Sequence, residues 1–506
     1  MGTVSQLLAG FRDRTDAPAL IDERGATSWR DLDDRVNRLI HVLRAHGVAP
    51  GERIAMLSGN RREIFEVYSA VAHCGVFVVP VNWHFAPDEV AYVVSNSGSR
   101  LVIVEPDHLP STAGVEVPLI VFGGTYEDAL AAATCDEPSE QTMGGVMFYT
   151  SGTTGRPKGV TSSAFPAGLP PTFYAQVAAG VTGLGVPPQG RTLLCGPGYH
   201  SAQWALSFFP LIGGSSVVVQ RRFDPAETLE LIDRHQVTNV HLVPTQFVRL
   251  LRLPEAAKAA FSGRSLEVVL HGAAPCSPDV KRQMIEWWGP KITEYYGATE
   301  GGFVSLIDSE TWLDHPGSVG RPLPAMDVQI VTDDGGPAEV GQPGVIHVRN
   351  ISGADFEYLG EPEKTAQAHS LAGYFTLGDI GYLDADGFLY LSDRRIDMII
   401  SGGVNIYPAE IEGVLAAHPS VVDAAVFGIP DEEYGERVHA TVQLATGAEW
   451  GEQQEAELEA YLRSRLAGYK VPRDWAVIDE MPRSDAGKLL KAPLRAPYWE
   501  RTGRSI

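Results

Sequence analysis

The stretch YTSGTTGRPKGV occupies Tyr149–Val160 of the 506-residue chain and is the most informative part of the sequence. A loop of this composition can fold its backbone N–H groups around phosphate oxygens, because glycine permits backbone angles that bulkier residues resist. A solvent-exposed turn without a ligand is the alternative, and the GxxxxGK[ST] pattern of a Walker A loop is not met. The hydroxyl donors are Thr150, Ser151, Thr153 and Thr154, the glycines are Gly152, Gly155 and Gly159, and the mobile charge is Lys158.

On either side of this loop, short apolar runs alternate with amphipathic stretches. The apolar residues between Leu32 and Leu43 have helical spacing, which ends near Gly47. Strands separated by helices predict a largely parallel α/β sheet. Between about Gly320 and Asn350, turn residues separate short alternating strands, which predicts a smaller β-rich subdomain. The runs typical of buried strands are Leu101–Val104, Leu119–Phe122, Ser216–Val219, Asn239–Val243 and Glu267–Leu270.

The pattern of apolar and turn residues changes again after Asp393. From Asp397 onward the chain carries its own helices and strands, over roughly a hundred residues, a common size for a domain. We therefore predict an α/β protein with a large N-terminal domain over residues 1–393, made of stacked α/β subdomains and the β-rich subdomain. A small, mobile α+β domain is expected over residues 397–506. Its expected elements include Ala409–Ala417, Val421–Phe427 and Glu455–Leu466.

The net charge of the chain is −23, from 40 Lys and Arg against 63 Asp and Glu. This acidity argues against a nucleic-acid partner or an anionic membrane partner, because both would repel the protein. The four cysteines, Cys74, Cys135, Cys195 and Cys276, form no CxxC pair. They argue against a zinc site and a disulfide framework, and they fit a reducing cytoplasm. We expect no signal peptide and no membrane span, and hence a cytoplasmic protein.

Further motifs follow the loop along the chain. HGAAP at His271–Pro275 follows an apolar strand and precedes a helix that Ser277 can cap and Pro278 can start. The remaining motifs are YYGATE at Tyr295–Glu300, Asp379 in FTLGDIGYLDADG, Arg394 in DRRIDMII, SGGVNIYPAEIE at Ser401–Glu412 and PRSDAGKLLK at Pro482–Lys491. Together these motifs resemble the adenylate-forming superfamily of acyl- and aryl-CoA synthetases, peptide-synthetase adenylation domains and luciferases. The resemblance covers nearly the whole chain and is greatest to an acyl- or aryl-CoA ligase.

The resemblance implies a site for ATP and Mg²⁺. By this resemblance Tyr296 stacks on the adenine, Thr299 contacts the α-phosphate, and Glu300 holds Mg²⁺. A hard cation of this kind binds carboxylate and phosphate oxygens together. Asp379 accepts hydrogen bonds from the ribose hydroxyls. Arg394 contacts the ribose or a phosphate, unless the adjacent arginine is the one that matches the motif position. The other ATP-binding residues are assigned to the phosphate loop and to Gly272, Ala273, Ala274, Pro275, Tyr295, Gly297 and Ala298.

The resemblance also implies a reaction in two steps. A carboxylate attacks the α-phosphorus of ATP and releases pyrophosphate, and a thiol, expected to be coenzyme A, then takes the acyl group. Lys488 bridges the carboxylate and the α-phosphate during adenylation, with Lys491 as the alternative residue. The small domain then rotates about a hinge at residues 394–396. This rotation removes Lys488 and brings in Gly402 and Gly403, which line a channel for CoA.

The acyl pocket is expected beside His200, which stands where related ligases carry a gating aromatic residue or histidine, although a structural role is equally open. Large aromatics such as Tyr295 would favour a compact or aromatic acid, but the same residues are also compatible with ordinary core packing. The other pocket residues are expected to be Tyr174, Tyr199, Ser201, Thr245, Phe247, Gly301 and Phe303.

The sequence departs from the pattern of the superfamily near the loop and the hinge. Ala164 stands where many members have histidine, and Asp393 stands where glycine is usual. Ile396 takes the place of an Asp or Lys, and Val404 takes the place of a residue that is often Glu. Asp397 is retained. These changes leave the thiol step open, so a carrier protein or an amine is an alternative acceptor, and a non-carboxylate oxyacid is an alternative substrate. A non-catalytic nucleotide-binding protein is disfavoured by Lys158, Glu300, Asp379 and Lys488. The oligomeric state also stays open, with a homodimer as one alternative.

Overall fold

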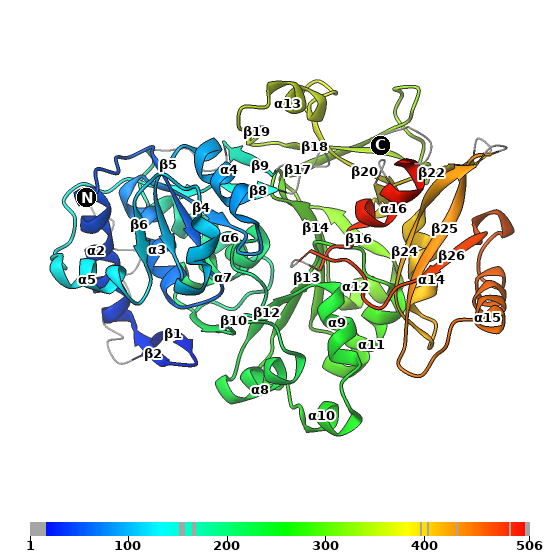
Figure 1. Cartoon of the computed structure of the whole chain (residues 1–506), viewed down its shortest axis with the longest axis horizontal. Helices are drawn as coiled ribbons and strands as arrows, with labels where there is room; N and C mark the ends of the chain where they lie inside the picture. The colour runs from blue at the N-terminus through cyan, green and yellow to red at the C-terminus, as the bar shows by residue number, and fades with distance from the viewer. Residues whose placement is uncertain are drawn as a thin grey trace.

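The computed structural model describes residues 17–150, 157–163, 168–394, 397–401, 404–431, 434–484 and 487–500. It is an α/β protein with a large N-terminal domain and a small C-terminal domain, as predicted. In Figure 1 the blue and cyan part of the chain lies on one side of the green central sheet, and the orange and red C-terminal domain lies on the other. Among the described residues, no helix has the length and apolar character needed to cross a bilayer.

The first α/β unit is built on a parallel sheet in the order β6-β5-β3-β4-β7. Its first helix starts where the Ser28 side chain accepts a hydrogen bond from the N–H of Asp31 at 3.1 Å, and it ends before Gly47, whose φ of +73° suits glycine. The strands are β3 (Arg53–Leu57), β4 (Phe77–Val81), β5 (Ser99–Val104), β6 (Leu119–Val121) and β7 (Gly145–Val146). The helices are α2 (Trp29–Ala45), α3 (Glu63–Cys74), α4 (Pro87–Ser97) and α5 (Thr125–Ala132).

A second, larger sheet runs in the order β17-β18-β20-β21-β16-β15-β14-β13-β12-β10-β11-β1-β2. From β11 through β10, β12 and β13 to β14 the strands are parallel. The strands of this part are β1 (Pro18–Asp22), β2 (Gly25–Ser28), β10 (Arg191–Leu194), β11 (Ser216–Val219), β12 (Asn239–Leu242), β13 (Val268–His271) and β14 (Ile292–Ala298). The helices are α6 (Thr172–Thr182), α7 (Ser201–Ile212), α8 (Pro225–His235), α9 (Pro244–Leu251), α10 (Glu255–Ala260), α11 (Pro278–Trp288) and α12 (Ser309–Asp314).

The β-rich subdomain is the antiparallel continuation of the larger sheet beyond β14. It extends past the expected end at Asn350, because β20 and β21 continue the same antiparallel pairing. Its strands are β15 (Gly302–Ile307), β16 (Ser318–Pro322), β17 (Met326–Val331), β18 (Gly344–Asn350), β20 (Phe375–Leu383) and β21 (Leu389–Arg394), with the helix α13 at Pro362–Ala368. A separate small sheet contains β8 (Phe148–Thr150), β9 (Lys158–Ser162) and β19 (Phe356–Tyr358).

The small domain has its own sheet and its own core. The strands follow the order β23-β22-β25-β24, and β26 pairs with β25. The apolar core includes Ile411, Leu415, Val442 and Leu458, which are fully buried. The strands are β22 (Ile399–Ser401), β23 (Val404–Ile406), β24 (Val421–Asp431), β25 (Gly435–Leu444) and β26 (Asp474–Val477). The helices are α14 (Pro408–Ala416), α15 (Glu452–Arg463) and α16 (Lys491–Glu500).

Most expected elements are confirmed within a few residues, but one local expectation is wrong. Ser277 does precede α11 and Pro278 does start it, as predicted. The side chain of Ser277, however, makes no capping hydrogen bond to the helix. Proline at the first position has its φ already set near the helical value, which favours a helix start here without the capping bond.

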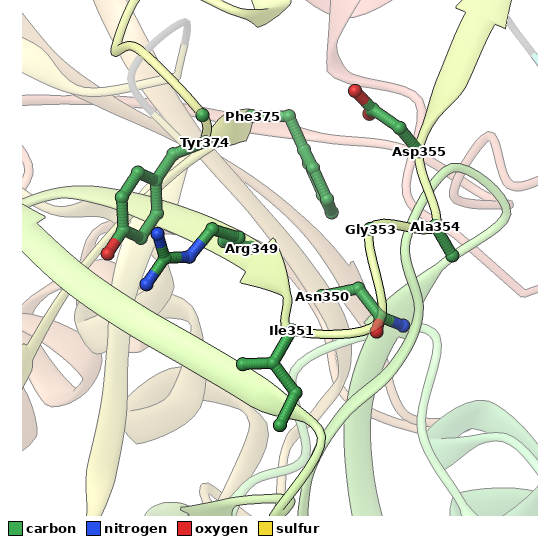
Figure 2. Close-up of a pocket in the computed structure, with 9 residues that line it drawn as sticks. Arg349, Asn350, Ile351, Gly353, Ala354, Asp355, Tyr374 and Phe375 are labelled. Atoms are coloured by element: carbon green, nitrogen blue, oxygen red, sulfur yellow. The ribbon is translucent and has the colours of Figure 1, made fainter.

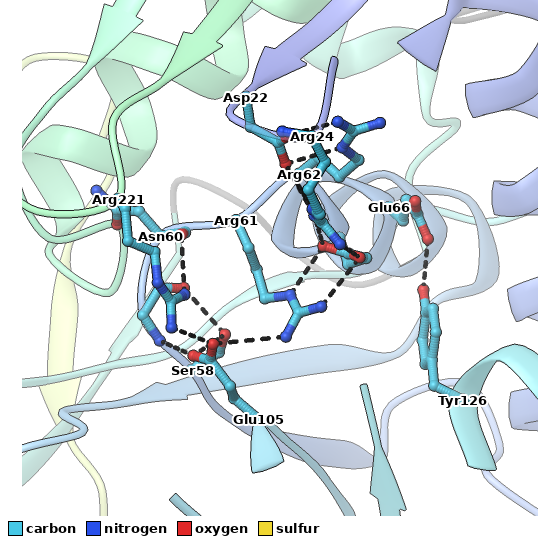
Figure 3. A network of polar contacts seen from close by, with 12 residues as sticks. Asp22, Arg24, Ser58, Asn60, Arg61, Arg62, Glu66, Glu105, Tyr126 and Arg221 are labelled. Carbon is cyan, nitrogen blue, oxygen red and sulfur yellow. Dashed lines mark hydrogen bonds and ion pairs between the residues drawn. The ribbon is translucent and has the colours of Figure 1, made fainter. Parts of the chain in front are cut away.

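A buried polar network joins the two sheets of the large domain (Figure 3). Asn60, after β3, donates to the carbonyls of Gly196 and Gln220, which follow β10 and β11, at 2.8 and 3.0 Å. The Glu105 carboxylate, after β5, binds Arg221. These contacts bring the carboxyl ends of strands from both sheets together, which is where α/β folds place their ligands.

The same network contains a carboxylate held by two arginines. Glu63, at the start of α3, accepts from Arg24 at 2.7 and 2.8 Å and from Arg61 at 2.8 and 3.0 Å. Burial opposes ionisation, but the hydrogen bonds from Arg24 and Arg61 outweigh it and hold the pKa of Glu63 below its usual range. The folded state therefore binds the Glu63 proton more weakly than the unfolded chain does.

This low pKa predicts an acid-sensitive contribution to stability. Because the folded pKa is depressed, the contribution is present above the unfolded pKa of about 4.3 and is lost as the pH falls below it. We expect the Tm of the wild-type protein to fall between about pH 5 and pH 3, and the Glu63→Gln variant to show a shallower fall. Differential scanning fluorimetry over this pH range measures both slopes, and equal slopes would contradict the assignment.

Candidate active site

The predicted phosphate loop connects two strands of the small sheet. β8 and β9 form an antiparallel hairpin in which Thr150 pairs with Lys158, so both residues flank the connecting loop. β19 pairs with the other edge of β9, with Tyr358 opposite Val160. The loop residues Ser151, Gly152, Thr153, Thr154 and Gly155 lie outside the described residues, as does Ala164.

The structure brings Lys158 and Glu300 together around Tyr358. The Tyr358 hydroxyl donates to Oε1 of Glu300 at 3.1 Å. The Lys158 ammonium lies 5.2 Å from the centre of the Tyr358 ring, within the range of a cation–π contact. Burial lowers the pKa of Lys158, and Lys364 adds to this effect, while Glu300 opposes it. One aromatic side chain, Tyr358, thus contacts both a cation and a carboxylate next to the loop end of the hairpin.

Asp379 joins this arrangement through Tyr296. Asp379 lies in β20, and its Oδ2 accepts a hydrogen bond from the Tyr296 hydroxyl at 2.7 Å. Because Tyr296 and Glu300 belong to one short segment, the predicted ribose-binding carboxylate contacts the segment that carries the predicted metal-binding carboxylate. In the backbone register Asp379 pairs with Arg394, although the side chain of Arg394 lies outside the described residues.

The HGAAP segment turns sharply at the end of β13. A Cβ on Gly272 would fall 2.7 Å from the backbone oxygen of Tyr295, so no larger residue fits. Ala273 adopts a φ of +69°, which an L-residue with a side chain rarely does. Backbone strain of this kind gathers where a ligand needs a particular geometry. Ala274 and Pro275 continue the segment toward α11.

The YYGATE segment is similarly close to its neighbours. A Cβ on Gly297 would lie 2.1 Å from the Gly302 carbonyl oxygen, and one on Gly301 would lie 2.7 Å from the Phe375 ring. Ala298 ends β14 and is partly exposed. The packing leaves the backbone of this segment little freedom, which would keep the side chains of Thr299 and Glu300 in place.

The start of α7 contacts the YYGATE segment. His200 is the N-cap residue of α7 and Ser201 its first residue. The Ser201 and Thr299 hydroxyls share a hydrogen bond of 2.8 Å. The ring of Tyr199 lies 4.4 Å from that of His200. The structure therefore brings the predicted acyl-pocket segment against the predicted α-phosphate contact.

Tyr295 ends a buried chain of polar groups. Its hydroxyl and Nε2 of His241 share a hydrogen bond of 2.9 Å, and Nδ1 of His241 is 2.9 Å from the Gln203 amide nitrogen. Burial lowers the pKa of His241 to about 3, and the proximity of His200 contributes, so His241 is neutral near pH 7. The Tyr295 ring also meets Phe303 edge to face at 4.8 Å.

Two of the expected pocket residues lie in the apolar cores. Tyr174 is 1% exposed, packs against Phe208 and Phe209, and donates from its hydroxyl to the Gly144 carbonyl at 2.9 Å. Phe247 is fully buried in α9 and lies 5.0 Å from the His271 ring. Their side chains contribute to the packing around the site, and a direct contact with the acid stays a prediction.

The turn that carries Lys488 reaches the large domain. The N–H of Lys488 donates to the Ser484 hydroxyl at 3.1 Å. Gly487 has a φ of +76°, and a Cβ there would fall 2.3 Å from the Thr245 hydroxyl. The turn therefore lies against the start of α9, beside the predicted acyl pocket. The expected CoA-channel residues Gly402 and Gly403, and the hinge departure at Ile396, lie outside the described residues.

A cavity of about 520 Å³ opens next to this site and is distinct from it. Phe375 forms part of its wall, and the opposite edge of that ring approaches Gly301. Figure 2 shows Arg349 and Tyr374 side by side on another part of the wall, where the guanidinium lies 4.7 Å from the ring centre. None of the predicted site residues lines this cavity.

The structure adds two residues that sequence reasoning missed. Tyr358 lies 58 positions from Glu300 in sequence, and no motif relates the two. His241 lies inside the predicted strand Asn239–Val243, close to its carboxyl end, and that position could have identified it.

Comparison with known proteins identifies the family. The sequence pattern described as AMP-binding enzyme matches residues 9–354, and the pattern of the AMP-binding enzyme C-terminal domain matches residues 410–488. The chain belongs to the AMP-binding enzyme family. It is therefore an adenylate-forming ligase that binds ATP, and the family's large and small domains are those described above.

Relatives in this family differ in their acceptors. A feruloyl-CoA synthase from Amycolatopsis sp is 34% identical over 94% of this chain and 94% of its own length. A fatty acid–[acyl-carrier-protein] ligase, ScoC from Streptomyces coeruleorubidus, is 30% identical over 97% of this chain and 95% of its own. The ATP-bound crystal structure of MatB from Rhodopseudomonas palustris superposes with a TM-score of 0.84, at 28% identity over 98% of this chain and 99% of that one.

Proposed function

We propose that this chain is an AMP-forming carboxylic acid–CoA ligase. In the first half-reaction the carboxylate of the acid attacks the α-phosphorus of ATP, and pyrophosphate leaves. In the second half-reaction the thiol of CoA attacks the acyl carbonyl, and AMP leaves with the bonding electrons. Both steps move negative charge, so positioned donors and cations account for most of the catalysis.

The observation that carries the proposal is that the motifs of Lys158 and Asp379 meet beside the YYGATE segment, while the turn that carries Lys488 lies against the start of α9. Lys158 and Glu300 meet at Tyr358, and Asp379 meets Tyr296 four residues before Glu300. The Lys488 turn lies against Thr245. Motifs spread over more than three hundred residues of sequence thus supply a triphosphate cradle, a ribose acceptor and a cation for the reacting phosphate.

The residues at Glu300 fit a magnesium ion. Among the described residues, no group of three or more His, Cys, Asp or Glu side chains is placed to hold a metal. A metal at Glu300 would therefore take most of its ligands from phosphate and water, which is the usual mode of Mg²⁺ in nucleotide sites. Mg²⁺ bound there would neutralise the charge of the leaving pyrophosphate. Tyr358 would orient the carboxylate that holds it.

The protein residues have separate tasks in the first half-reaction. Thr299, held by Ser201, donates to the α-phosphate, and Lys158 neutralises the phosphate chain. Lys488 places its ammonium between the incoming carboxylate and the α-phosphorus, where negative charge develops. The strained Ala273 and the tightly packed Gly272 backbone form the surface against which the adenine lies, opposite Tyr296.

The second half-reaction requires the small domain to move. The large sheet ends with β21 at Arg394 and the small sheet begins with β22 at Ile399. We infer domain boundaries at residues 393 and 397 with a hinge at residues 394–396, so that Lys488 withdraws and the Gly402–Gly403 loop enters. An apolar residue at position 396 replaces the polar hinge residue of related proteins, and the domain rotation remains part of the proposal.

The acid that fits this chain is compact or aromatic. Tyr295 is 5% exposed and is tied to His241 on one side and to Phe303 on the other, which would end the acyl pocket early. Both ring nitrogens of the neutral His241 are already bonded, to Tyr295 and Gln203, so this group holds Tyr295 in place and adds no charge to the pocket. The similarity to a feruloyl-CoA synthase supports the same class of acid.

The test is a panel of acids measured in two assays. Ferulate, benzoate, octanoate and palmitate are each tested for exchange of labelled pyrophosphate into ATP. The same mixtures are then tested for AMP release with and without CoA, and the products are identified by mass spectrometry. We expect exchange with ferulate or benzoate to exceed exchange with palmitate, and CoA to stimulate AMP release.

The other outcomes separate the alternatives. Exchange without stimulation by CoA, but with acylation of an added acyl carrier protein, would favour the carrier-protein reaction that ScoC performs. Acylation of an added amine would favour an amide product. Absence of exchange across the whole panel would overturn the proposal.

A further inference from the structure

Helix α9 touches the small domain at both of its ends. At its start, Thr245 lies against the backbone of Gly487. Just past its end, Nη2 of Arg252 donates to the carbonyl of Val422, the second residue of β24, at 2.8 Å. The eight residues of α9 span about 12 Å. Two contacts that far apart constrain the orientation of the small domain and not only its distance from the large one.

Inside the small domain, a single side chain connects these two contacts. Nε and Nη2 of Arg483 bind the two carboxylate oxygens of Asp423 at 2.6 and 2.7 Å. Nη1 of the same guanidinium donates to the Gly487 carbonyl at 2.6 Å. A bidentate charge-assisted pair is strong and geometrically specific. Asp423 follows Val422 directly, so Arg483 links the residue at the far end of α9 to the turn at its start.

The backbone hydrogen bonds of the described part of the turn are local. The turn is closed by the Ser484 N–H bonded to the Lys488 carbonyl at 2.8 Å and by the Gly487 N–H bonded to the Ser484 carbonyl at 2.7 Å. These bonds lie within the turn and do not fix its direction. The contacts of Arg483 with Asp423 and the Gly487 carbonyl, by contrast, attach the turn to the long strand β24. Arg483 therefore helps to set the direction of the peptide that precedes Lys488.

We infer that Arg483 and Asp423 are positioning residues for Lys488, and that Arg252 fastens this unit to α9 for the first half-reaction. This inference rests on the proposed function, because it assumes that Lys488 acts during adenylation and leaves before transfer. Arg483 and Asp423 move with the small domain, whereas the Arg252 contact crosses between the domains and must break on rotation. Loss of either contact should slow adenylation and leave acyl transfer largely unchanged.

The activity test compares the two half-reactions in Arg483→Ala, Arg252→Ala and a control. The control is Arg249→Ala, an exposed arginine on the same helix α9. Adenylation is followed by pyrophosphate exchange with the best acid of the panel, and transfer by single-turnover reaction of the synthetic acyl-adenylate of that acid with CoA. We expect exchange to fall about tenfold in Arg483→Ala and about fivefold in Arg252→Ala, with transfer within about twofold of wild type.

A second measurement needs no substrate. Hydrogen–deuterium exchange of the peptide covering residues 482–491, in the full chain without ligand, reports how firmly the turn is held. We expect faster exchange in Arg483→Ala and Arg252→Ala than in wild type or Arg249→Ala. Arg483→Lys keeps the positive charge but cannot bind both carboxylate oxygens of Asp423 as the guanidinium does, so it should give an intermediate result in both assays.

The outcomes distinguish this inference from the proposed function. If no acid supports exchange in the wild type, the proposed function fails, and deuterium exchange still tests whether the contacts hold the turn. If adenylation and transfer fall by equal factors in Arg483→Ala and Arg483→Lys, the two residues only stabilise the domain and the inference is overturned. Unchanged deuterium exchange in the turn would overturn it as well.

Discussion

Replacing Lys488 by alanine is expected to reduce acid-dependent pyrophosphate exchange by about a hundredfold to a thousandfold, the usual effect of removing a group that stabilises transition-state charge. Lys158 is not expected to replace this ammonium, because it lies beside Tyr358 and is assigned to the phosphate chain. The Tm should change little, since the side chain of Lys488 is partly exposed on a turn. The exchange assay and a melting curve measure the two quantities.

Lys491 supplies the matched control for this prediction. Lys491 lies three residues further on and forms an ion pair with Glu412 at 2.8 Å, within the small domain. Lys491→Ala should therefore retain most of the exchange activity. Transfer from the preformed acyl-adenylate to CoA should survive in Lys488→Ala, because this step follows the departure of the lysine. A variant pair with the opposite pattern, active without Lys488 and inactive without Lys491, would refute the assignment.

Replacing Glu294 by alanine is expected to destabilise the folded protein by about 3–5 kcal/mol, because it leaves a charge buried without its partner. Nζ of Lys281 lies 2.7 Å from Oε2 of Glu294, and the Lys281 side chain is fully buried against the ring of Trp312. Burial lowers the pKa of Lys281, and Glu294 offsets part of that shift. Urea unfolding followed by tryptophan fluorescence measures the loss.

A double variant separates the charge effect from a packing effect. Lys281→Met combined with Glu294→Leu replaces the pair by apolar side chains of similar size, which costs little or even stabilises in other proteins. We expect it to recover most of the stability lost in Glu294→Ala. If the double variant is as unstable as the single one, the loss comes from packing and the buried charge is not its cause.

The sequence predicted best the elements whose signal is local. Ser216–Val219 is a continuous apolar run between turn residues, and it forms β11 with those bounds. β24 was expected to end at Phe427 but continues to Asp431, because its pairing with β25 carries on through a glycine, an isoleucine, a proline and the aspartate. Pairing with a neighbouring strand depends on contacts distant in sequence, which a pattern within one segment does not contain.

The same limit applies to the candidate site. The motif residues Glu300 and Asp379 were identified because each stands in a recognisable string of its own. Tyr358 was not, because its importance comes only from the residue it meets across the fold. His241 depends on burial, which determines whether a histidine is a neutral hydrogen-bonding group or a titrating one. Partners of this kind become visible only when the chain is folded.

The polar network between the two sheets limits how the large domain can be divided. The parallel sheet from β3 to β7 is one continuous piece of sequence and has the outline of a unit that could be expressed alone. Two of its buried carboxylates nevertheless take an arginine from outside the unit, since Glu63 is bound by Arg24 and Glu105 by Arg221 in addition to the internal Arg61. A fragment cut at the ends of this sheet would leave Arg61 to balance both carboxylates. Truncations intended for crystallography or for split-protein reporters should therefore retain the chain from β1 through Arg221.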